Sequence, residues 1–371
     1  MQAYLDNAAT TKMDDEVIDF MHQIMSTHYG NPSSIYESGR QSRVIVEEAR
    51  ITIARLLNVS PAEIFFTSGG TESINTIISG VLQNNEVERV ITSPIEHSAV
   101  FNSLEFYCKQ YNKSVEYLTV DANGLIDLQE LDELLKNGNG KALVSLMHIN
   151  NELGNILPID KVSHICKNNN ALFFSDTVQS MGKLELDFSS DLLDFAVASA
   201  HKFHGPKGIG FMYINGNNKL TPFIIGGSQE RNMRAGTENI SAIAAMAKAF
   251  ELSCSIIDET SKRVLELKKY LIHKLKNDFP EISFNGDVNS ISNILNIGIP
   301  KSNKNEMYLM KLDINGVYVS GGSACSSGAI KDSHVIKAIG KNELIRPIRL
   351  ALSKYTKKEE IDYFLKMLKK L

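Results

Sequence analysis

The chain has 371 residues, of which 43% are hydrophobic and 22% are charged, and its formal net charge at pH 7 is −4. This composition is that of a soluble folded protein and excludes a disordered, collagen-like or coiled-coil chain, and the length allows two domains. The basic residues are spread along a slightly acidic sequence, so we expect neither direct nucleic-acid binding nor a broad cationic surface for a membrane.

The cysteines and the N-terminal segment indicate the compartment. Cys108, Cys166, Cys254 and Cys325 show no C-x-x-C pairing and are too few for a disulfide scaffold in a chain of this length. Segment 1–16 is acidic and has no apolar run, so we expect no export signal. No stretch approaches the roughly 18 uninterrupted apolar residues of a membrane span. We therefore expect reduced thiols and a cytoplasmic location.

The first part of the chain alternates helical patterns with short apolar runs. Because these runs are apolar on both faces, they predict strands inside a mainly parallel sheet with helices on both sides. The expected strands are 64–67, 89–93, 143–149, 171–175, 195–200 and 209–214. The expected helices are 42–57, one beginning near Thr71, 100–111, 128–136 and 158–168. We predict a three-layer α/β large domain at residues 15–255.

The pattern changes after residue 227. A long helical region at 240–278 is broken near Ile257, and the apolar segments 291–299 and 345–353 flank an expected helix at 305–314. A Gly/Ser-rich loop at 320–328 and a terminal helix at 357–371 complete the chain. We predict a smaller α+β domain made of residues 1–14 and 256–371.

Segment 64–73, IFFTSGGTES, predicts a strand, a turn of small residues and the start of a helix. The glycines, of which Gly70 is the second, allow backbone N–H groups to approach an anion, and the helix N-terminus and the Thr71 hydroxyl add to the attraction. The segment is therefore a candidate phosphate site, although an ordinary capped turn has the same pattern. It matches neither a Walker loop nor G-x-G-x-x-G.

Two further expected strands are followed directly by polar or reactive side chains. Asp176 follows the strand at 171–175, and Gln179 lies three residues later. Ser199, His201 and Lys202 come at the end of the strand at 195–200. The carboxyl ends of parallel strands are where such sheets bind ligands. A strand-end aspartate is also a common turn cap, whereas a partly desolvated lysine costs folding energy and becomes a usable amine nucleophile.

These features together match the needs of pyridoxal phosphate. Its phosphate needs a cup of N–H groups, its ring nitrogen needs a carboxylate that keeps it protonated, and its aldehyde needs a lysine. His201 and His204 could suggest zinc instead, but they lie in a Gly/Pro-rich loop without a nearby third ligand, so we expect no metal.

Two more residues complete the candidate site. His97 follows the strand at 89–93, so its imidazole could stack on the ring and exchange protons, or it could be an ordinary loop histidine. Cys325 lies among small flexible residues in segment 320–328, SGGSACSSG, where a thiol can act as a nucleophile. An incidental cysteine in a plain loop is the alternative.

Motifs along nearly the whole chain resemble the cysteine desulfurases, which are class V members of the fold-type-I pyridoxal-phosphate enzymes. They are YLDNAATT at 4–11, GNPSS at 30–34, FTSGGTES at 66–73, EH at 96–97, MHINNE at 147–152, SAHK at 199–202, RAGTEN at 234–239 and SAC at 323–325. The length of the cysteine loop is similar to that of the long-loop group. Tyr36 departs from the histidine usual there, which concerns packing near the entrance more than the chemistry.

The resemblance implies a role for each matched position. Lys202 would bind the cofactor aldehyde, Asp176 the ring nitrogen, and Gln179 and Asn151 the ring oxygen. The phosphate would be held by Gly70, Thr71, Ser199 and His201, with Thr237 supplied by the other subunit of a homodimer. Arg349 would bind the substrate carboxylate, Lys202 and His97 would transfer protons, and Cys325 would receive the sulfur.

The implied reaction removes sulfur from L-cysteine, giving L-alanine and a persulfide on Cys325 that passes to an acceptor protein. The chain ends soon after its last helix, where housekeeping relatives carry a longer tail. We therefore keep tRNA thiolation and DNA phosphorothioation open as pathways beside iron–sulfur assembly. The alternative functions are a selenocysteine lyase, another class V aminotransferase, or a noncatalytic carrier of persulfide.

Overall fold

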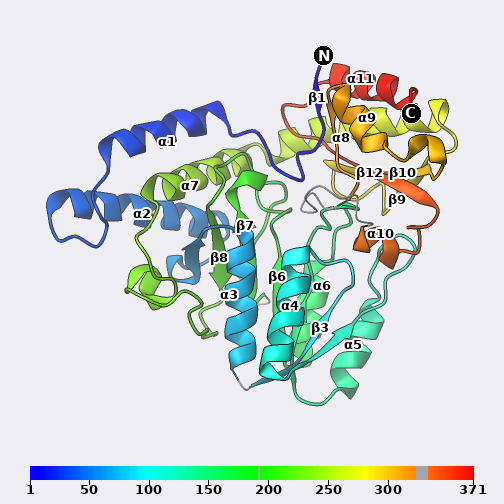
Figure 1. Cartoon of the computed structure of the whole chain (residues 1–371). Coiled ribbons are helices and arrows are strands. Elements are labelled where there is room, and N and C mark those ends of the chain that lie inside the picture. Colours follow the sequence, from blue (N-terminus) through cyan, green and yellow to red (C-terminus); the bar gives the residue numbers. More distant parts are fainter. Residues whose placement is uncertain (85, 191–192, 323–332) are drawn as a thin grey trace.

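The computed structural model describes residues 1–84, 86–190, 193–322 and 333–371. A seven-stranded sheet lies at the centre of the larger part of the molecule (Figure 1), in the order β2-β8-β7-β6-β5-β3-β4. Its strand β8 is antiparallel to β2 and β7, and the other neighbouring pairs are parallel. The predicted α/β fold with a mainly parallel sheet is confirmed. The strands are β2 (Ile64–Thr67), β3 (Val87–Thr92), β4 (Ser114–Tyr117), β5 (Lys141–Ser145), β6 (Leu172–Asp176), β7 (Phe195–Ser199) and β8 (Gly210–Ile214).

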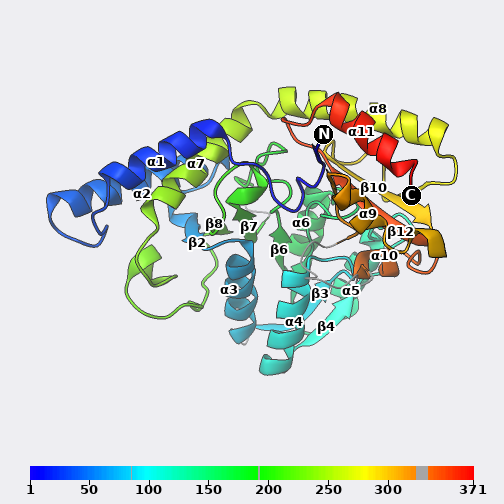
Figure 2. The same ribbon diagram turned by 45° about the horizontal axis from the view of Figure 1, so that its top comes forward.

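Helices cover both faces of this sheet, because alternate strand residues point to opposite sides. Phe174 packs in a buried cluster with α3 and α4, whereas its neighbour Phe173 packs in another with α2, α5, α6 and α7. Figure 2 shows α3 and α4 together on one side. The helices of this larger part are α1 (Asp15–Thr27), α2 (Glu37–Leu56), α3 (Gly70–Gln83), α4 (Ser98–Tyr111), α5 (Leu128–Asn137), α6 (Ile159–Asn168) and α7 (Ile240–Ser255).

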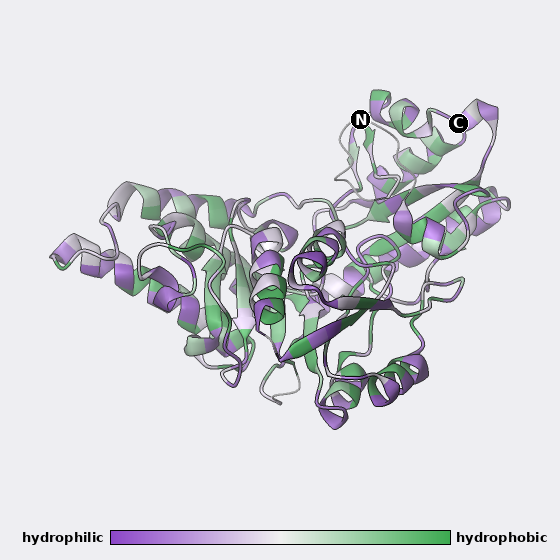
Figure 3. Cartoon of the chain, turned by 60° about the horizontal axis from the view of Figure 1, so that its bottom comes forward, coloured by the Kyte–Doolittle hydropathy of each residue, from purple (hydrophilic) through white to green (hydrophobic). Residues whose placement is uncertain are grey.

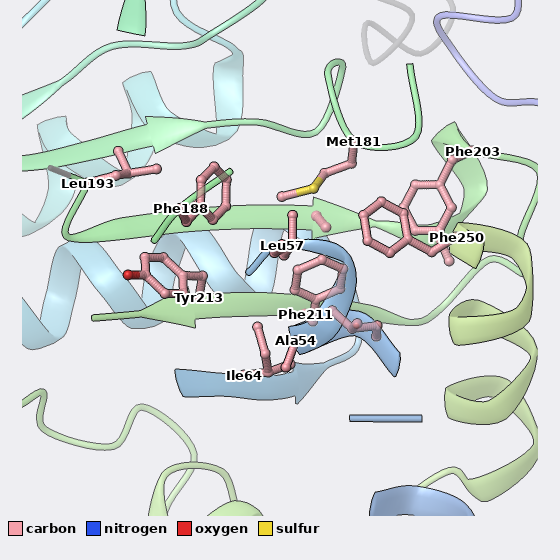
Figure 4. Close-up of a cluster of buried hydrophobic side chains, with 14 of the residues drawn as sticks. Ala54, Leu57, Ile64, Met181, Phe188, Leu193, Phe203, Phe211, Tyr213 and Phe250 are labelled. Atoms are coloured by element: carbon pink, nitrogen blue, oxygen red, sulfur yellow. The ribbon is translucent and has the colours of Figure 1, made fainter. Parts of the chain in front are cut away.

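Aromatic side chains fill the core on the α2 and α7 side of the sheet (Figure 4). The Phe250 ring from α7 lies 5.4 Å from that of Phe203 and 6.0 Å from that of Phe211, measured between centroids. Phe203 directly follows η2 (Ala200–Lys202), the short 3-10 turn at the end of β7. This packing therefore anchors the segment that carries Lys202.

The smaller part of the molecule has its own sheet, in the order β12-β10-β9, and a separate pair formed by β1 and β11. Ala3 and Leu5 from the N-terminus pack in one buried cluster with the strands and with α8 and α11. Figure 3 shows the hydrophobic residues concentrated on the strands and on the helix faces turned toward them. The elements are β1 (Ala3–Tyr4), α8 (Ile257–Asp278), β9 (Ser283–Asn285), β10 (Ile294–Pro300), α9 (Tyr308–Ile314), β11 (Val317–Tyr318), α10 (His334–Ala338), β12 (Ile345–Ala351) and α11 (Lys358–Leu368).

Some elements differ from their predicted bounds. The strand expected to reach residue 149 ends at Ser145, although the N–H groups of Leu146 and His148 still donate to the backbone oxygens of Phe174 and Asp176 in β6. The helix expected at 305 starts at Tyr308, since η4 (Asn303–Asn305) forms a 3-10 turn first. The short strands β1, β4, β9 and β11 and the helices α1 and α10 were not predicted.

Helices α7 and α8 meet at Ile256 with a bend of 69°. Among the described residues, no single helix combines the length and hydrophobicity of a membrane span, and this bent pair meets those criteria only when its two helices are taken together.

Candidate active site

A cavity of about 190 Å³ lies at the carboxyl ends of β6 and β7. Ten of the twelve residues singled out in the sequence line it, together with Ala8, Ala9, Ile74, Met147 and Val178. The structure therefore brings these side chains into one place, from segments far apart in the chain. The ten are Gly70, Thr71, His97, Asn151, Asp176, Gln179, Ser199, His201, Lys202 and Arg349.

The sheet places the acid and the amine. Strands β6 and β7 are parallel neighbours, with Asp176 opposite Val197, so both end at the same edge. Asp176 is the last residue of β6, and Lys202 ends the 3-10 turn that directly follows β7. Residues 195–198 of β7 are apolar and buried on both faces of the sheet. The reactive side chains therefore come only after the strand has ended.

The N-terminus of α3 forms one end of the cavity. Gly69 has φ of +151°, a conformation that side chains rarely adopt, and it precedes the first residue of the helix. A Cβ on Gly70 would lie 3.0 Å from Val178 Cγ2 and 3.8 Å from Ser199 Cβ. Glycine therefore keeps open the space between the helix and Ser199, and the unpaired N–H groups of a first helical turn attract anions there.

The N-terminal segment holds the amine of Lys202. Its Nζ donates to the backbone oxygens of Ala8 and Ala9, at 2.7 Å each. Gln179 Nε2 donates to the same Ala8 oxygen at 2.9 Å. The carbonyls of residues 8 and 9 thus organise two side chains of the site, and we did not expect this from the sequence.

Arg349 reaches the cavity from strand β12 of the smaller part of the molecule and is almost fully buried. Its Nη2 donates to Asp6 Oδ1 at 2.7 Å, and its Nη1 donates to the backbone oxygen of Asn151 at 3.0 Å. Its Nε has no hydrogen-bond partner among the described residues. The cation therefore keeps donor capacity for an anion in the cavity.

Burial shifts the pKa values of Asp176 and His97, two side chains that line the cavity. Burial raises the pKa of Asp176, outweighing the charges of His97 and Lys202, which lower it. Burial lowers the pKa of His97, against the nearby carboxylate of Asp176, which raises it. His97 Nδ1 accepts the N–H of Ala99 at 3.1 Å, so the neutral ring carries its proton on Nε2.

His201 is neutral at physiological pH. Burial and the charges of Lys202, Lys207 and Lys183 lower its pKa to about 4. Its Nδ1 pairs with the hydroxyl of Thr10 at 3.2 Å. His204 does not line the cavity with it, and its Nδ1 instead donates to the backbone oxygen of Lys12 at 2.8 Å.

Two predicted residues are not placed in the cavity. Thr237 is exposed in the loop before α7 and does not line it. Cys325 lies outside the described residues. Tyr36 is exposed at the N-terminus of α2 and is not part of the cavity wall either.

Three residues that support the site were not predicted from the sequence. Asp6 holds Arg349, Lys183 donates to Gln179, and Glu96 accepts the N–H of Met147 at 2.9 Å. Each acts through a contact between distant segments or through burial, which a local pattern does not reveal. The one feature of the sequence that could have indicated these residues is that Asp6 and Glu96 lie within two of the family motifs and Lys183 lies four residues after Gln179.

The chain matches a family model described as Aminotransferase class-V over residues 3–364. It is 40% identical to Cysteine desulfurase IscS of Dictyoglomus turgidum over 375 residues, which covers 100% of this chain and 94% of that protein. It is also 40% identical to Cysteine desulfurase 1 of Trichormus variabilis, covering 97% and 90% of the two chains.

Solved structures show the same architecture. A NifS-like protein superposes with a TM-score of 0.91 at 36% identity, covering 100% of this chain and 99% of the other. SspA in complex with cysteine superposes with a TM-score of 0.83 at 32% identity, covering 96% of this chain and 100% of the other.

Proposed function

The chain belongs to the class-V aminotransferase family and, within it, to the cysteine desulfurases, and we propose that it transfers the sulfur of L-cysteine to Cys325, releasing L-alanine, with pyridoxal phosphate as cofactor. One observation carries the proposal: a single cavity joins the amine of Lys202, the carboxyl of Asp176, the N-terminus of α3 and the guanidinium of Arg349. The structure of SspA in complex with cysteine supports cysteine as the substrate.

The residues of the cavity fit this cofactor. The space that a Cβ on Gly70 would narrow, beside Ser199, suits a phosphate group. Asp176 is buried without a cationic hydrogen-bond partner among the described residues, and burial raises its pKa. A protonated ring nitrogen beside it would stabilise its carboxylate form. When bound, pyridoxal phosphate supplies an aldehyde that combines with amines and a protonated ring that withdraws electrons.

Different residues of the cavity would bind the cofactor's phosphate, bind its aldehyde and transfer protons. Gly70, Thr71, Ser199 and His201 would hold the phosphate group, and the neutral His201 would accept or donate a hydrogen bond without adding charge. Lys202 would bind the aldehyde and would hold at its Nζ the proton taken from the substrate's α-carbon. His97 would exchange a proton with the substrate amine through Nε2.

Arg349 selects and orients the substrate. A guanidinium fork binds a carboxylate at two points, and Arg349 has donors left over after its bonds to Asp6 and Asn151. Because Arg349 comes from β12 and the proposed phosphate ligands come from α3 and the end of β7, separate groups would bind the substrate's carboxylate and the cofactor's phosphate.

Cys325 receives the sulfur. Its thiolate attacks the substrate sulfur, an S–S bond forms, and the bond between Cβ and sulfur breaks. The electron pair of that bond stays with the substrate carbon, which takes a proton and becomes the methyl group of alanine. The persulfide then passes to an acceptor protein, for which iron–sulfur assembly, tRNA thiolation and DNA phosphorothioation are the pathways we propose to test.

A homodimer completes the proposed site. Thr237 is exposed in the loop before α7, where a second copy could receive it as a phosphate ligand. The neighbouring end of the molecule also exposes apolar side chains, including Tyr29 and Ile35 at 87% and 89%. Size-exclusion chromatography with light scattering should give a dimer, and Thr237→Ala should weaken cofactor retention; a monomer that retains the cofactor fully contradicts this part of the proposal.

The deciding experiment is a single turnover of the loaded enzyme with L-cysteine, with alanine and the Cys325 persulfide both quantified. We expect one alanine per persulfide, and neither from Cys325→Ala. Pyruvate in place of alanine would contradict the proposal. Turnover of selenocysteine or another amino acid that is equal in wild type and Cys325→Ala would instead support a selenocysteine lyase or an aminotransferase.

A further inference from the structure

Lys183 lies one turn after Gln179 and donates to it twice. Its Nζ is 3.0 Å from the backbone oxygen of Gln179 and 2.8 Å from the side-chain Oε1. At the other end of the same amide, Nε2 donates to the backbone oxygen of Ala8 at 2.9 Å. The amide thus lies between the backbone oxygen of Ala8, which can only accept, and the amine of Lys183, which can only donate when it is protonated.

We propose that Lys183 is a positioning residue that fixes the side-chain amide of Gln179 with its NH₂ group toward the cavity. The proposal rests on the proposed function, in which Gln179 serves the ring oxygen of pyridoxal phosphate. Turning the amide by 180° would set its NH₂ group against the amine of Lys183 and its oxygen against the carbonyl of Ala8. The hydrogen bond to Ala8 would be lost in either protonation state of Lys183, and the bond to Lys183 would also be lost when its amine is protonated, so the observed orientation is the more stable one.

The orientation matters because the two ends of an amide have nearly the same shape but opposite hydrogen-bonding character. An NH₂ group has a second hydrogen after bonding to Ala8, and Gln179 lines the cavity. That hydrogen can be donated to an oxygen of a bound ring. In the reversed amide, an acceptor would face the same oxygen and would repel it.

Folding alone gives little reason for a lysine here. Burial lowers the pKa of Lys183 to about 7, with the charge of Lys202 adding to the effect, so the site is a poor one for an ammonium group. None of the ion pairs between described residues includes Lys183. Its hydrogen bonds go to Gln179, so the neighbour it serves is a residue of the cavity.

Lys183 also lies beside a second, smaller space. Together with Asn7, Gly182 and Lys202, it lines a cavity of about 50 Å³ behind the site. A methionine at position 183 could keep the stem in place without overpacking, because the extra room lies next to it. Lys183→Met therefore removes the donor while leaving the surrounding packing close to the original.

The test is a double-mutant cycle on cofactor binding rather than on activity. Apo forms of wild type, Lys183→Met, Gln179→Ala and the double variant are titrated with pyridoxal phosphate, and the absorbance spectrum of each loaded form is recorded. We expect Lys183→Met to raise the Kd by roughly threefold to tenfold, the effect of one neutral hydrogen bond, and to have no further effect in the Gln179→Ala background.

Two controls separate positioning from general structure. Lys161→Met removes an exposed lysine of α6 that does not line the cavity, and it should leave the Kd unchanged. Lys183→Arg retains a donor and should recover most of the affinity. If Lys183→Met does not fold, Lys183→Gln, which keeps a neutral donor group, takes its place in the cycle with a smaller expected effect.

The outcomes are distinct. An unchanged Kd in Lys183→Met, or an equal loss of affinity with and without Gln179, overturns the role assigned to Lys183 and leaves the proposed function standing. Absence of any pyridoxal phosphate binding by the wild type overturns both.

Discussion

Arg349 donates to Asp6 over 2.7 Å, although 343 residues separate them in the chain. The other carboxylate oxygen of Asp6 accepts the hydroxyl of Ser320 at 2.7 Å. One acid from the N-terminal segment therefore holds both the cation proposed to bind substrate and the residue that leads into segment 320–328. The orientation of Arg349 depends on a residue that is not part of the cavity wall.

Removing that acid should destabilise the protein. Asp6→Ala leaves the buried guanidinium of Arg349, whose side chain is 2% exposed, without its anionic partner, and we expect a loss of about 3 kcal/mol in the free energy of unfolding. Urea unfolding of the apo protein measures it. Asp15→Ala, at an exposed ion pair with Lys12, is the control and should cost less than about 1 kcal/mol. Equal effects of the two changes would contradict the role of Asp6.

The pair Arg50 and Glu230 anchors the loop that leads to Thr237. Arg50 binds both oxygens of Glu230, at 2.9 and 2.8 Å, and Glu230 also accepts the N–H of Phe66 at 2.8 Å. Glu230 has φ of +44°, so this contact holds the loop in a strained conformation.

Breaking this pair should be costly. Glu230→Ala removes the buried carboxylate that pairs with Arg50 and leaves the guanidinium only the half-exposed Glu47 and the backbone oxygen of Ile64. We expect a loss of about 3 kcal/mol in unfolding free energy. Glu251→Ala, at the exposed pair with Arg55, is the matched control and should have little effect. A Glu230→Ala protein as stable as this control would show that the buried pair does not anchor the loop.

Glu96 should make stability depend on pH. Burial raises its pKa from 4.5 to about 8, and one of its oxygens has no hydrogen-bond partner among the described residues. The folded protein therefore keeps this carboxyl protonated in a range where the unfolded chain ionises it. The stability that Glu96 contributes is complete below the unfolded pKa of 4.5 and is lost as pH rises to about 8.

Glu96→Gln removes that dependence, because an amide does not ionise. Relative to wild type, the apo variant should gain roughly 3 kcal/mol of stability between pH 5 and pH 8, measured by urea unfolding at both pH values. Glu86→Gln, at an exposed glutamate, should show no such gain. A difference between Glu96→Gln and wild type that is the same at both pH values would mean that Glu96 is ionised in the folded protein.

The cysteines should differ sharply in reactivity. Burial raises the pKa of Cys108 and of Cys254 from 9.0 to about 11, and it raises that of Cys166 further. At pH 7.5 their thiolate fractions are small, so iodoacetamide should label Cys325 first, as followed by peptide mass spectrometry. In urea all four should react at similar rates. Labelling of Cys254 as fast as that of Cys325 in the folded protein would count against the assignment of Cys325 as the nucleophile.

The sheet and the positions of Asp176 and Lys202 could be predicted because they depend on local patterns. Strands buried on both faces are continuous apolar runs, and their carboxyl ends meet at one edge, so residues just after them converge. The roles of these residues stay predictions, whereas their common location is a finding.

The supporting contacts could not be predicted because they join distant segments. Nothing local in YLDNAATT indicates that the carbonyl of Ala8 accepts from Lys202 or that Asp6 pairs with Arg349. Strands β1 and β11 have two residues each, too few for a period to be visible. The antiparallel direction of β8 likewise follows from the short connection after Lys202, which a hydrophobic pattern does not encode.

The central claim is that the cavity around Lys202 and Asp176 binds pyridoxal phosphate through a bond to Lys202. Borohydride reduction of the loaded protein, followed by digestion and peptide mass spectrometry, tests it most directly. The account predicts that the pyridoxyl group is found on Lys202. A label on Lys183 or Lys207, or no label on any lysine, would contradict it.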